Sequence, residues 1–237
     1  MRRWRRRNKF MLKNKRVAVF GGTSGIGRSV ARAAWTEGAD VVVIGRNGLP
    51  ENEPHESVDV RDEGAVGDFF ERQAPFDHVV STVGSPARRR EVQEISREEA
   101  EEHFAVKYWG QFFVLKHAVR GLKPGGSIVL TTGLSPARPA VGFATQAAIS
   151  GALEALVRTH AVELAPVRLN AVCPGNIESE KLFSELSAEA VATRVLSANP
   201  MAGLLEHAAQ SYLFALTNSH LTGQILVVDG GGSLAGL

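Results

Sequence analysis

The segment Gly21-Gly22-Thr23-Ser24-Gly25-Ile26-Gly27 decides the fold. An apolar run typical of a buried strand, Arg16–Phe20, precedes it, and a helix is predicted from about Gly25 to Glu37. In such a turn the first glycine permits tight folding, and the later glycines let the backbone approach a pyrophosphate. The helix N-terminus adds N–H donors and the positive end of a dipole. The predicted dinucleotide phosphate site consists of Gly21, Thr23, Ser24, Gly25, Ile26 and Gly27; a strand–helix turn without a ligand is the alternative.

Short β-branched runs recur along the chain and alternate with amphipathic helical stretches. Alternation of this kind predicts an α/β protein: a three-layer, doubly wound (Rossmann) fold with a parallel sheet of about seven strands. Two long helices are expected at about 97–122 and 144–164, and a loop is expected at 45–56, which contains two prolines. No linker divides residues 13–237, so we expect a single domain. The further strands are expected near Ser57 and at 41–44, 79–81, 127–131, 167–172 and 224–228.

The composition is that of a globular protein, with 237 residues and 44% hydrophobic residues. The single cysteine, Cys173, excludes an internal disulfide framework. No apolar run is long enough to span a membrane, and no histidine spacing indicates a metal site. We therefore expect a cytoplasmic protein without a metal or a membrane partner.

Residues 1–12 are strongly basic although the net charge of the chain is only +2. Such a run predicts a disordered extension. Three alternatives remain open: an arm for phosphate or membrane surfaces, an arm for nucleic acid, and translation that starts at Met11. Nucleic-acid binding is disfavoured because the rest of the chain is mildly acidic and the arm shows no aromatic interleaving beyond Trp4.

The end of the second predicted strand, Gly45-Arg46-Asn47, bears on the choice of dinucleotide. Proteins that bind NAD place a carboxylate near this point to bind the ribose 2′-hydroxyl. Here Arg46 offers a guanidinium, which attracts a 2′-phosphate. Arg46 and Asn47 therefore predict binding of NADP(H) rather than NAD(H), unless Arg46 is only a solvated loop residue.

From about Lys13 to the C-terminus the sequence resembles the short-chain dehydrogenase/reductase family. The glycine turn, Asp59-Val60, the segment Arg168–Gly175 and the segment Thr222–Gly231 carry the resemblance. It implies that Asp59 and Val60 contact adenine, and that the subunits form a homodimer or homotetramer. Ser81-Thr82-Val83-Gly84 stands where the family usually has Asn-Asn-Ala-Gly. The remaining cofactor-binding residues implied by the resemblance are Thr82, Gly84, Pro174, Gly175, Ile177 and Ser179.

The residues that the family uses for catalysis are replaced. The positions of the family's Tyr, Lys, Ser and Asn fall on Gln146, Ser150, Gly133 and Lys107, and the chain has no Tyr-x-x-x-Lys. Hydride transfer to a carbonyl carbon still leaves an oxygen that needs an acid. We therefore predict an NADP(H)-dependent oxidoreductase acting on a carbonyl or alcohol, with Lys107 as acid or base and hydrogen bonds from Thr132 and Gln146. Lys107 could instead only hydrogen-bond backbone or cofactor.

A second hypothesis keeps the binding site and drops the redox chemistry, which would make the protein an NADPH sensor or a partner-binding module. The expected partner in the first case is a small-molecule substrate. The stretch 178–202 predicts a lid over it. Its apolar residues indicate an apolar substrate: Leu182, Phe183, Leu186 and Val191.

Overall fold

The computed structural model describes residues 11–46, 48, 54–85, 89–175, 177 and 204–234. The described chain forms one seven-stranded sheet with the order β3-β2-β1-β4-β5-β6-β7, and every neighbouring pair is parallel. The order reverses between β1 and β4, which is the signature of a doubly wound sheet. The strands are β1 (Arg16–Phe20), β2 (Asp40–Gly45), β3 (Glu56–Ser57), β4 (Phe76–Ser81), β5 (Leu122–Thr131), β6 (Arg168–Pro174) and β7 (Ile225–Val228).

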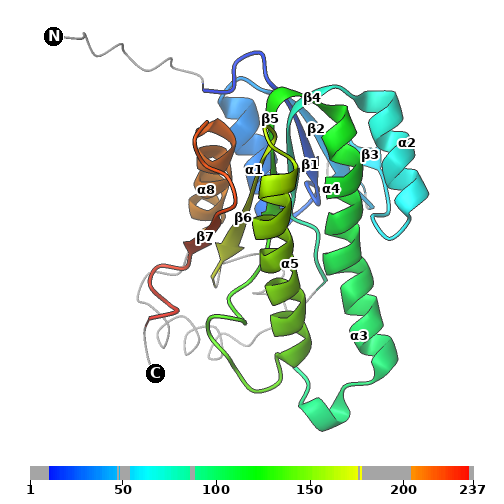
Figure 1. The fold of residues 1–237 in the computed structure, drawn as a ribbon, viewed down its shortest axis with the longest axis vertical. Coiled ribbons are helices and arrows are strands. Elements are labelled where there is room, and N and C mark those ends of the chain that lie inside the picture. Colours follow the sequence, from blue (N-terminus) through cyan, green and yellow to red (C-terminus); the bar gives the residue numbers. More distant parts are fainter. Residues whose placement is uncertain are drawn as a thin grey trace, which may run out of the picture.

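Helices cover both faces of the sheet (Figure 1). Helices α1 (Gly25–Thr36) and α8 (Leu205–Thr217) pack together on one face. The other face carries α2 (Glu63–Gln73), α4 (Gly110–Gly121) and α5 (Ala144–Glu163). The three-layer fold expected from the sequence is thereby confirmed.

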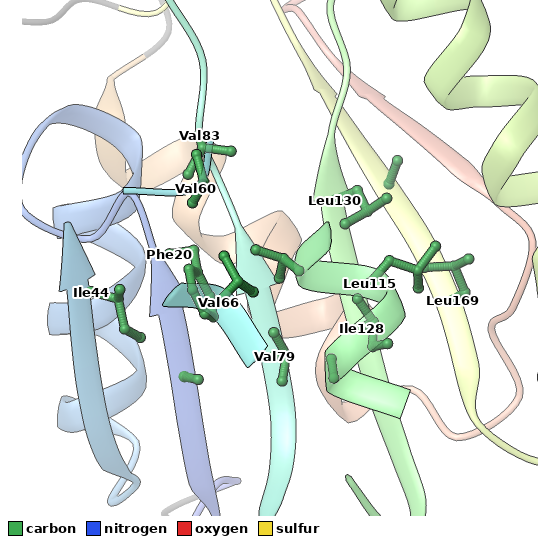
Figure 2. Packing of buried hydrophobic residues seen from close by; sticks show 14 of the residues in the cluster. Phe20, Ile44, Val60, Val66, Val79, Val83, Leu115, Ile128, Leu130 and Leu169 are labelled. Atoms are coloured by element: carbon green, nitrogen blue, oxygen red, sulfur yellow. The ribbon is translucent and has the colours of Figure 1, made fainter. Parts of the chain in front are cut away.

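Alternation along β1 divides the core between the two layers. Ala18 and Phe20 pack toward α2, α4 and α5, whereas Val17 and Val19 pack toward α1 and α8. Figure 2 shows Phe20, Val79 and Ile128 of three neighbouring strands in the first of these layers. Leu12 belongs to the second layer and is 1% exposed, so the chain enters the core within two residues of the first described position.

The long helix predicted at 97–122 is continuous but not uniform. It consists of α3 (Arg97–Phe104), a π-helical segment η3 (Ala105–Trp109) and α4. π-Turns place one extra residue in a helical turn and often occur at functional sites. In Figure 1, α3 and the first turns of α5 project beyond the carboxyl ends of the strands.

His78 lies buried at the opposite end of the sheet from the carboxyl ends of the strands. Its Nδ1 is 2.9 Å from Ser127 Oγ, and the side chain neighbours Asp77, which binds Lys15 and Lys123. Burial is the main cause that lowers the pKa of His78 from 6.5 to about 4; the charge of Asp77 opposes the shift, and the charges of Arg168, Lys15 and Lys123 add to it.

We predict that this histidine makes stability depend on pH. The unfolded chain takes up a proton below pH 6.5 and the folded chain does so only near pH 4, so the free energy of unfolding falls as pH drops between these values, by at most about 3 kcal/mol. Urea titrations at pH 7 and pH 4.5 should show a smaller fall for His78→Asn than for the wild type. The exposed His220→Asn is the control and should behave as the wild type does; an equal fall in all three proteins would contradict the prediction.

Candidate functional site

A cleft of about 550 Å³ opens at the carboxyl ends of the central strands. This is where doubly wound sheets bind their ligands. The cleft brings together most of the residues predicted from the sequence to bind a dinucleotide: Gly21, Thr23, Ser24, Gly25, Ile26, Gly27, Arg46, Val60, Thr82, Gly84, Gly175 and Ile177. Of the others, Asp59 and Pro174 do not line it, and Asn47 and Ser179 lie outside the described residues.

The glycine turn is held closed by Thr82, which follows β4. Its hydroxyl donates hydrogen bonds to the carbonyl oxygens of Phe20 and Gly21, at 3.1 and 3.3 Å. A Cβ at Gly27 would lie 2.2 Å from the Gly21 oxygen and 2.4 Å from the Thr82 hydroxyl. The turn therefore excludes any side chain at position 27, because no real Cβ makes such contacts.

The N-terminus of α1 is arranged for an anion. Ser24 caps the helix without a side-chain hydrogen bond, and the first turn contains no acidic residue. Gly25 has a φ of +50°, and no atom lies within 4 Å of where its Cβ would be, so the chain leaves room beside it. Backbone N–H groups and the helix dipole both favour negative charge at this position. The donors present thus fit a phosphate group.

Two arginines flank the far end of the cleft. Arg46 is exposed at the end of β2, and Arg61 follows the Asp59-Val60 pair; both line the cleft. Hydrogen bonds from Arg61 lower the pKa of Asp59, and the charge of Arg46 lowers it too. Asp59 is therefore an anion that forms an ion pair with Arg61, in which Asp59 Oδ2 lies 2.5 Å from Arg61 Nη2. The sequence analysis missed Arg61, although its position directly after Asp-Val was a usable signal.

Gly175 and Ile177 form the cleft wall at the end of β6. A Cβ at Gly175 would lie 2.6 Å from the Cβ of Asp229, so glycine lets this segment pass the residues after β7. Pro174 is instead the last residue of β6, where it pairs with Val228.

Lys107 reaches the same end of the sheet from the π-helical segment. Its Nζ donates a hydrogen bond to the carbonyl oxygen of Thr132 at 3.3 Å. A Cβ at Gly133 would lie 3.4 Å from this Nζ and 3.3 Å from the hydroxyl of Ser150. Burial lowers the pKa of the Lys107 ammonium. The amine and the Ser150 hydroxyl therefore both lie close to Gly133.

Gln111 fixes the position of Lys107. Its side-chain amide donates to the Thr131 carbonyl at 2.8 Å and to the Lys107 carbonyl at 3.0 Å, and its Oε1 accepts from the Thr131 N–H at 2.8 Å. One fully buried amide thus ties the π-turn to the end of β5. Thr132, which was predicted from the sequence to hydrogen-bond the substrate, is buried: the residue is only 2% exposed.

Gln146, the third residue predicted to act in catalysis, lies on the far side of this region. It lines a cavity of about 10 Å³ together with His103, Glu99 and Arg90. His103 in turn contacts Ser85, which lines the large cleft. The sequence analysis did not single out His103 as a site residue.

Comparison with known proteins places the chain in a family. Residues 21–233 match the family model described as enoyl-(acyl carrier protein) reductase. The chain is 30% identical to short-chain dehydrogenase/reductase ucsE of Acremonium sp, over 94% of this chain and 97% of the relative. The protein belongs to the short-chain dehydrogenase/reductase family of oxidoreductases.

Two further relatives carry cofactor information in their names. NADPH-dependent aldehyde reductase 1, chloroplastic, of Arabidopsis thaliana is 29% identical over 93% of this chain and 86% of its own length. The solved structure of a small-chain dehydrogenase in complex with NADPH is 35% identical, with a TM-score of 0.83, and covers 94% of this chain and 100% of its own. Among the described residues of the present chain, no group of three or more potential metal ligands occurs, and no helix is long and apolar enough to cross a membrane.

We predict that Gly27→Ala destabilises the fold. The added methyl group must displace either the Gly21 carbonyl or the Thr82 hydroxyl, and overpacking of this kind costs about 1–3 kcal/mol. Thermal and urea unfolding should show the loss. Gly151→Ala is the matched control, because the space beside Gly151 in α5 is open, and it should raise stability by up to about 1 kcal/mol. Equal stability of the two variants would contradict the prediction.

Proposed function

We propose that the protein is an NADP(H)-dependent oxidoreductase that transfers a hydride between the nicotinamide and a carbonyl or alcohol group of a small molecule. The observation that carries this proposal is the cleft itself, which joins the glycine turn, the N-terminus of α1 and Arg46. The NADPH named for two of the similar proteins supports the choice of dinucleotide.

Different residues of the cleft would bind different parts of the cofactor. The turn at residues 21–27 would hold the pyrophosphate, and Arg46 with Asn47 would hold the 2′-phosphate. Val60 and Asp59 would flank the adenine, with Thr82 and Gly84 along the ribose side. Gly175, Ile177, Pro174 and Ser179 would frame the nicotinamide. When bound, the cofactor supplies or accepts the hydride.

Arg46 sets the preference for the phosphorylated cofactor. We predict that Arg46→Ala weakens NADPH binding about tenfold or more and leaves NADH binding unchanged, because only NADPH carries the phosphate that the guanidinium binds. Calorimetric titration of both cofactors measures this. Arg120→Ala is the control: Arg120 is exposed at the C-terminal end of α4, next to the start of β5, and its loss should change neither affinity. An equal loss for NADPH and NADH would contradict the role of Arg46.

Lys107 supplies the cation of the proposed active site. In the resemblance drawn above, its position belongs to the family's Asn, and Ser150 takes that of the family's Lys. The Lys107 amine and the Ser150 hydroxyl both lie close to Gly133, so a cation is present in this region although it comes from a different helix. Its lowered pKa makes it competent as acid or base at Nζ, and in its charged form it stabilises an alkoxide. Thr132 holds it through a carbonyl, and Gln146 remains a candidate for hydrogen-bonding the substrate.

We predict that Lys107→Met binds NADPH with wild-type affinity and loses turnover by about 100-fold or more. Methionine keeps the length of the side chain and removes the amine. NADPH oxidation with a panel of aldehydes, ketones and quinones, read by absorbance, measures the effect. Lys116→Met is the control, because Lys116 is exposed and bound to Glu63 outside the cleft. Unchanged turnover would remove Lys107 from the mechanism.

The same panel separates the enzyme from the alternative of a non-redox sensor or partner-binding module. Tight NADPH binding by the wild type without turnover of any panel member would favour the alternative. The expected homodimer or homotetramer stays a prediction; Trp109 at the start of α4 is 46% exposed and lies among stacked aromatic rings that would suit such a contact.

A further inference from the structure

A serine and a histidine meet beside the cleft, 18 residues apart in sequence. Ser85 Oγ lies 2.7 Å from His103 Nδ1. Ser85 is half-buried and lines the cleft, directly after Gly84, whereas His103 is 8% exposed on α3. The imidazole thus contacts the cleft through the serine hydroxyl.

His103 also lines a cavity of about 10 Å³, the size of one water molecule. Glu99, one turn earlier on α3, lines the same cavity and has a buried oxygen, Oε1, without a hydrogen-bond partner among the described residues. Its other oxygen, Oε2, lies 3.5 Å from Arg90 Nε. The charged groups facing His103 are therefore Glu99 from its own helix and Arg90 from the loop after β4. Gln146 and Thr145 of α5 complete the wall, and Glu102 lines the large cleft.

We propose that Ser85 and His103 form a proton relay for the substrate, in which the Ser85 hydroxyl exchanges a proton with the substrate oxygen and His103 Nδ1 exchanges one with Ser85. This inference rests on the proposed oxidoreductase function. Ser85 would be the catalytic residue, since it touches the substrate, and His103 would act through it.

In the reductive direction the step balances as follows. The carbonyl carbon accepts the hydride, and the electron pair of the C–O π bond moves to oxygen. That oxygen takes the proton of Ser85 Oγ, and Ser85 regains a proton from the protonated imidazole. The carbonyl compound is reduced to the alcohol, NADPH is oxidised to NADP⁺, and His103 is reprotonated from solvent. Alcohol oxidation runs the same transfers in reverse.

The relay and Lys107 would have different roles in the reaction. An imidazole exchanges protons readily near neutral pH, which suits it to a relay. Lys107, hydrogen-bonded to the Thr132 carbonyl, then contributes charge beside the developing alkoxide rather than the proton. The two roles predict different responses to pH.

The first test uses four variants and the substrate panel. Ser85→Ala should lower kcat about 100-fold with little change in KM or NADPH affinity, because a relay group acts on the chemical step. Ser85→Thr keeps the hydroxyl and should retain most activity. His103→Asn keeps a hydrogen-bonding group near Nδ1 but does not titrate, so kcat should fall and the corresponding limb of the kcat/KM–pH profile should vanish. Lys107→Met should lower kcat while that limb persists.

Ser219→Ala and His220→Asn are matched controls at exposed positions and should leave every parameter unchanged. The second test needs no turnover. In nitrogen-15 NMR of the histidine rings, the His103 signals are those lost in His103→Asn. They should show reversible protonation across the pH range of the activity limb, and Ser85→Ala should shift the Nδ1 signal.

The outcomes separate the proposals. An active wild type with unchanged Ser85→Ala overturns the relay and leaves the oxidoreductase and Lys107 standing. A ring of His103 that keeps one neutral tautomer over the whole range of activity overturns it too. A wild type that turns over nothing overturns both the relay and the proposed function. Should His103→Asn fail to fold, Ser85→Ala and the NMR titration of the wild type still decide.

Discussion

The close approach of Gly27 to the Gly21 carbonyl and the Thr82 hydroxyl is the contact on which the site depends. It lets α1 begin directly at the sheet, so that the N-terminus of the helix opens into the cleft. Thr82 directly follows β4, which lies beside β1 where the strand order reverses. Its hydroxyl donates a hydrogen bond to the Gly21 carbonyl and so stabilises the turn. The proposed phosphate site is therefore formed by two chain segments, and their packing sets its geometry.

The position of Lys107 shows how a charge can be preserved when the residue that usually carries it is lost. Removing an ammonium from water is costly, and this half-buried amine donates a hydrogen bond to the backbone carbonyl of Thr132. The buried amide of Gln111 holds the π-turn against β5 and so fixes the backbone that carries the amine. Desolvation then lowers the pKa of the amine, which is a useful property for a group that works near neutral pH.

Local sequence patterns predicted the strands, the glycine turn and most of the cleft wall, because strand periodicity and turn geometry are short-range properties. They missed the π-turn, which depends on the hydrogen bonds that Gln111 makes to β5. His103 was missed for a related reason: it matters through Ser85, which only the folded chain brings into contact with it. Arg61 was missed although its partner, Asp59, is only two residues away in sequence. The apolar stretch 178–202 lies outside the described residues, so the expected apolar substrate remains a prediction.

A tyrosine–lysine pair joins two tasks in neighbouring groups, since the phenol carries the proton and the ammonium tunes it. The proposals for this chain assign the two tasks to different residues. The ammonium of Lys107 lies near Gly133, whereas the hydroxyl–imidazole pair comes from the loop after β4 and from α3. A serine hydroxyl is too weak an acid to act alone, and it therefore needs the imidazole behind it. Under these proposals, separation of charge from proton transfer gives a physical reason for both a half-buried lysine and a buried histidine on one continuous helix.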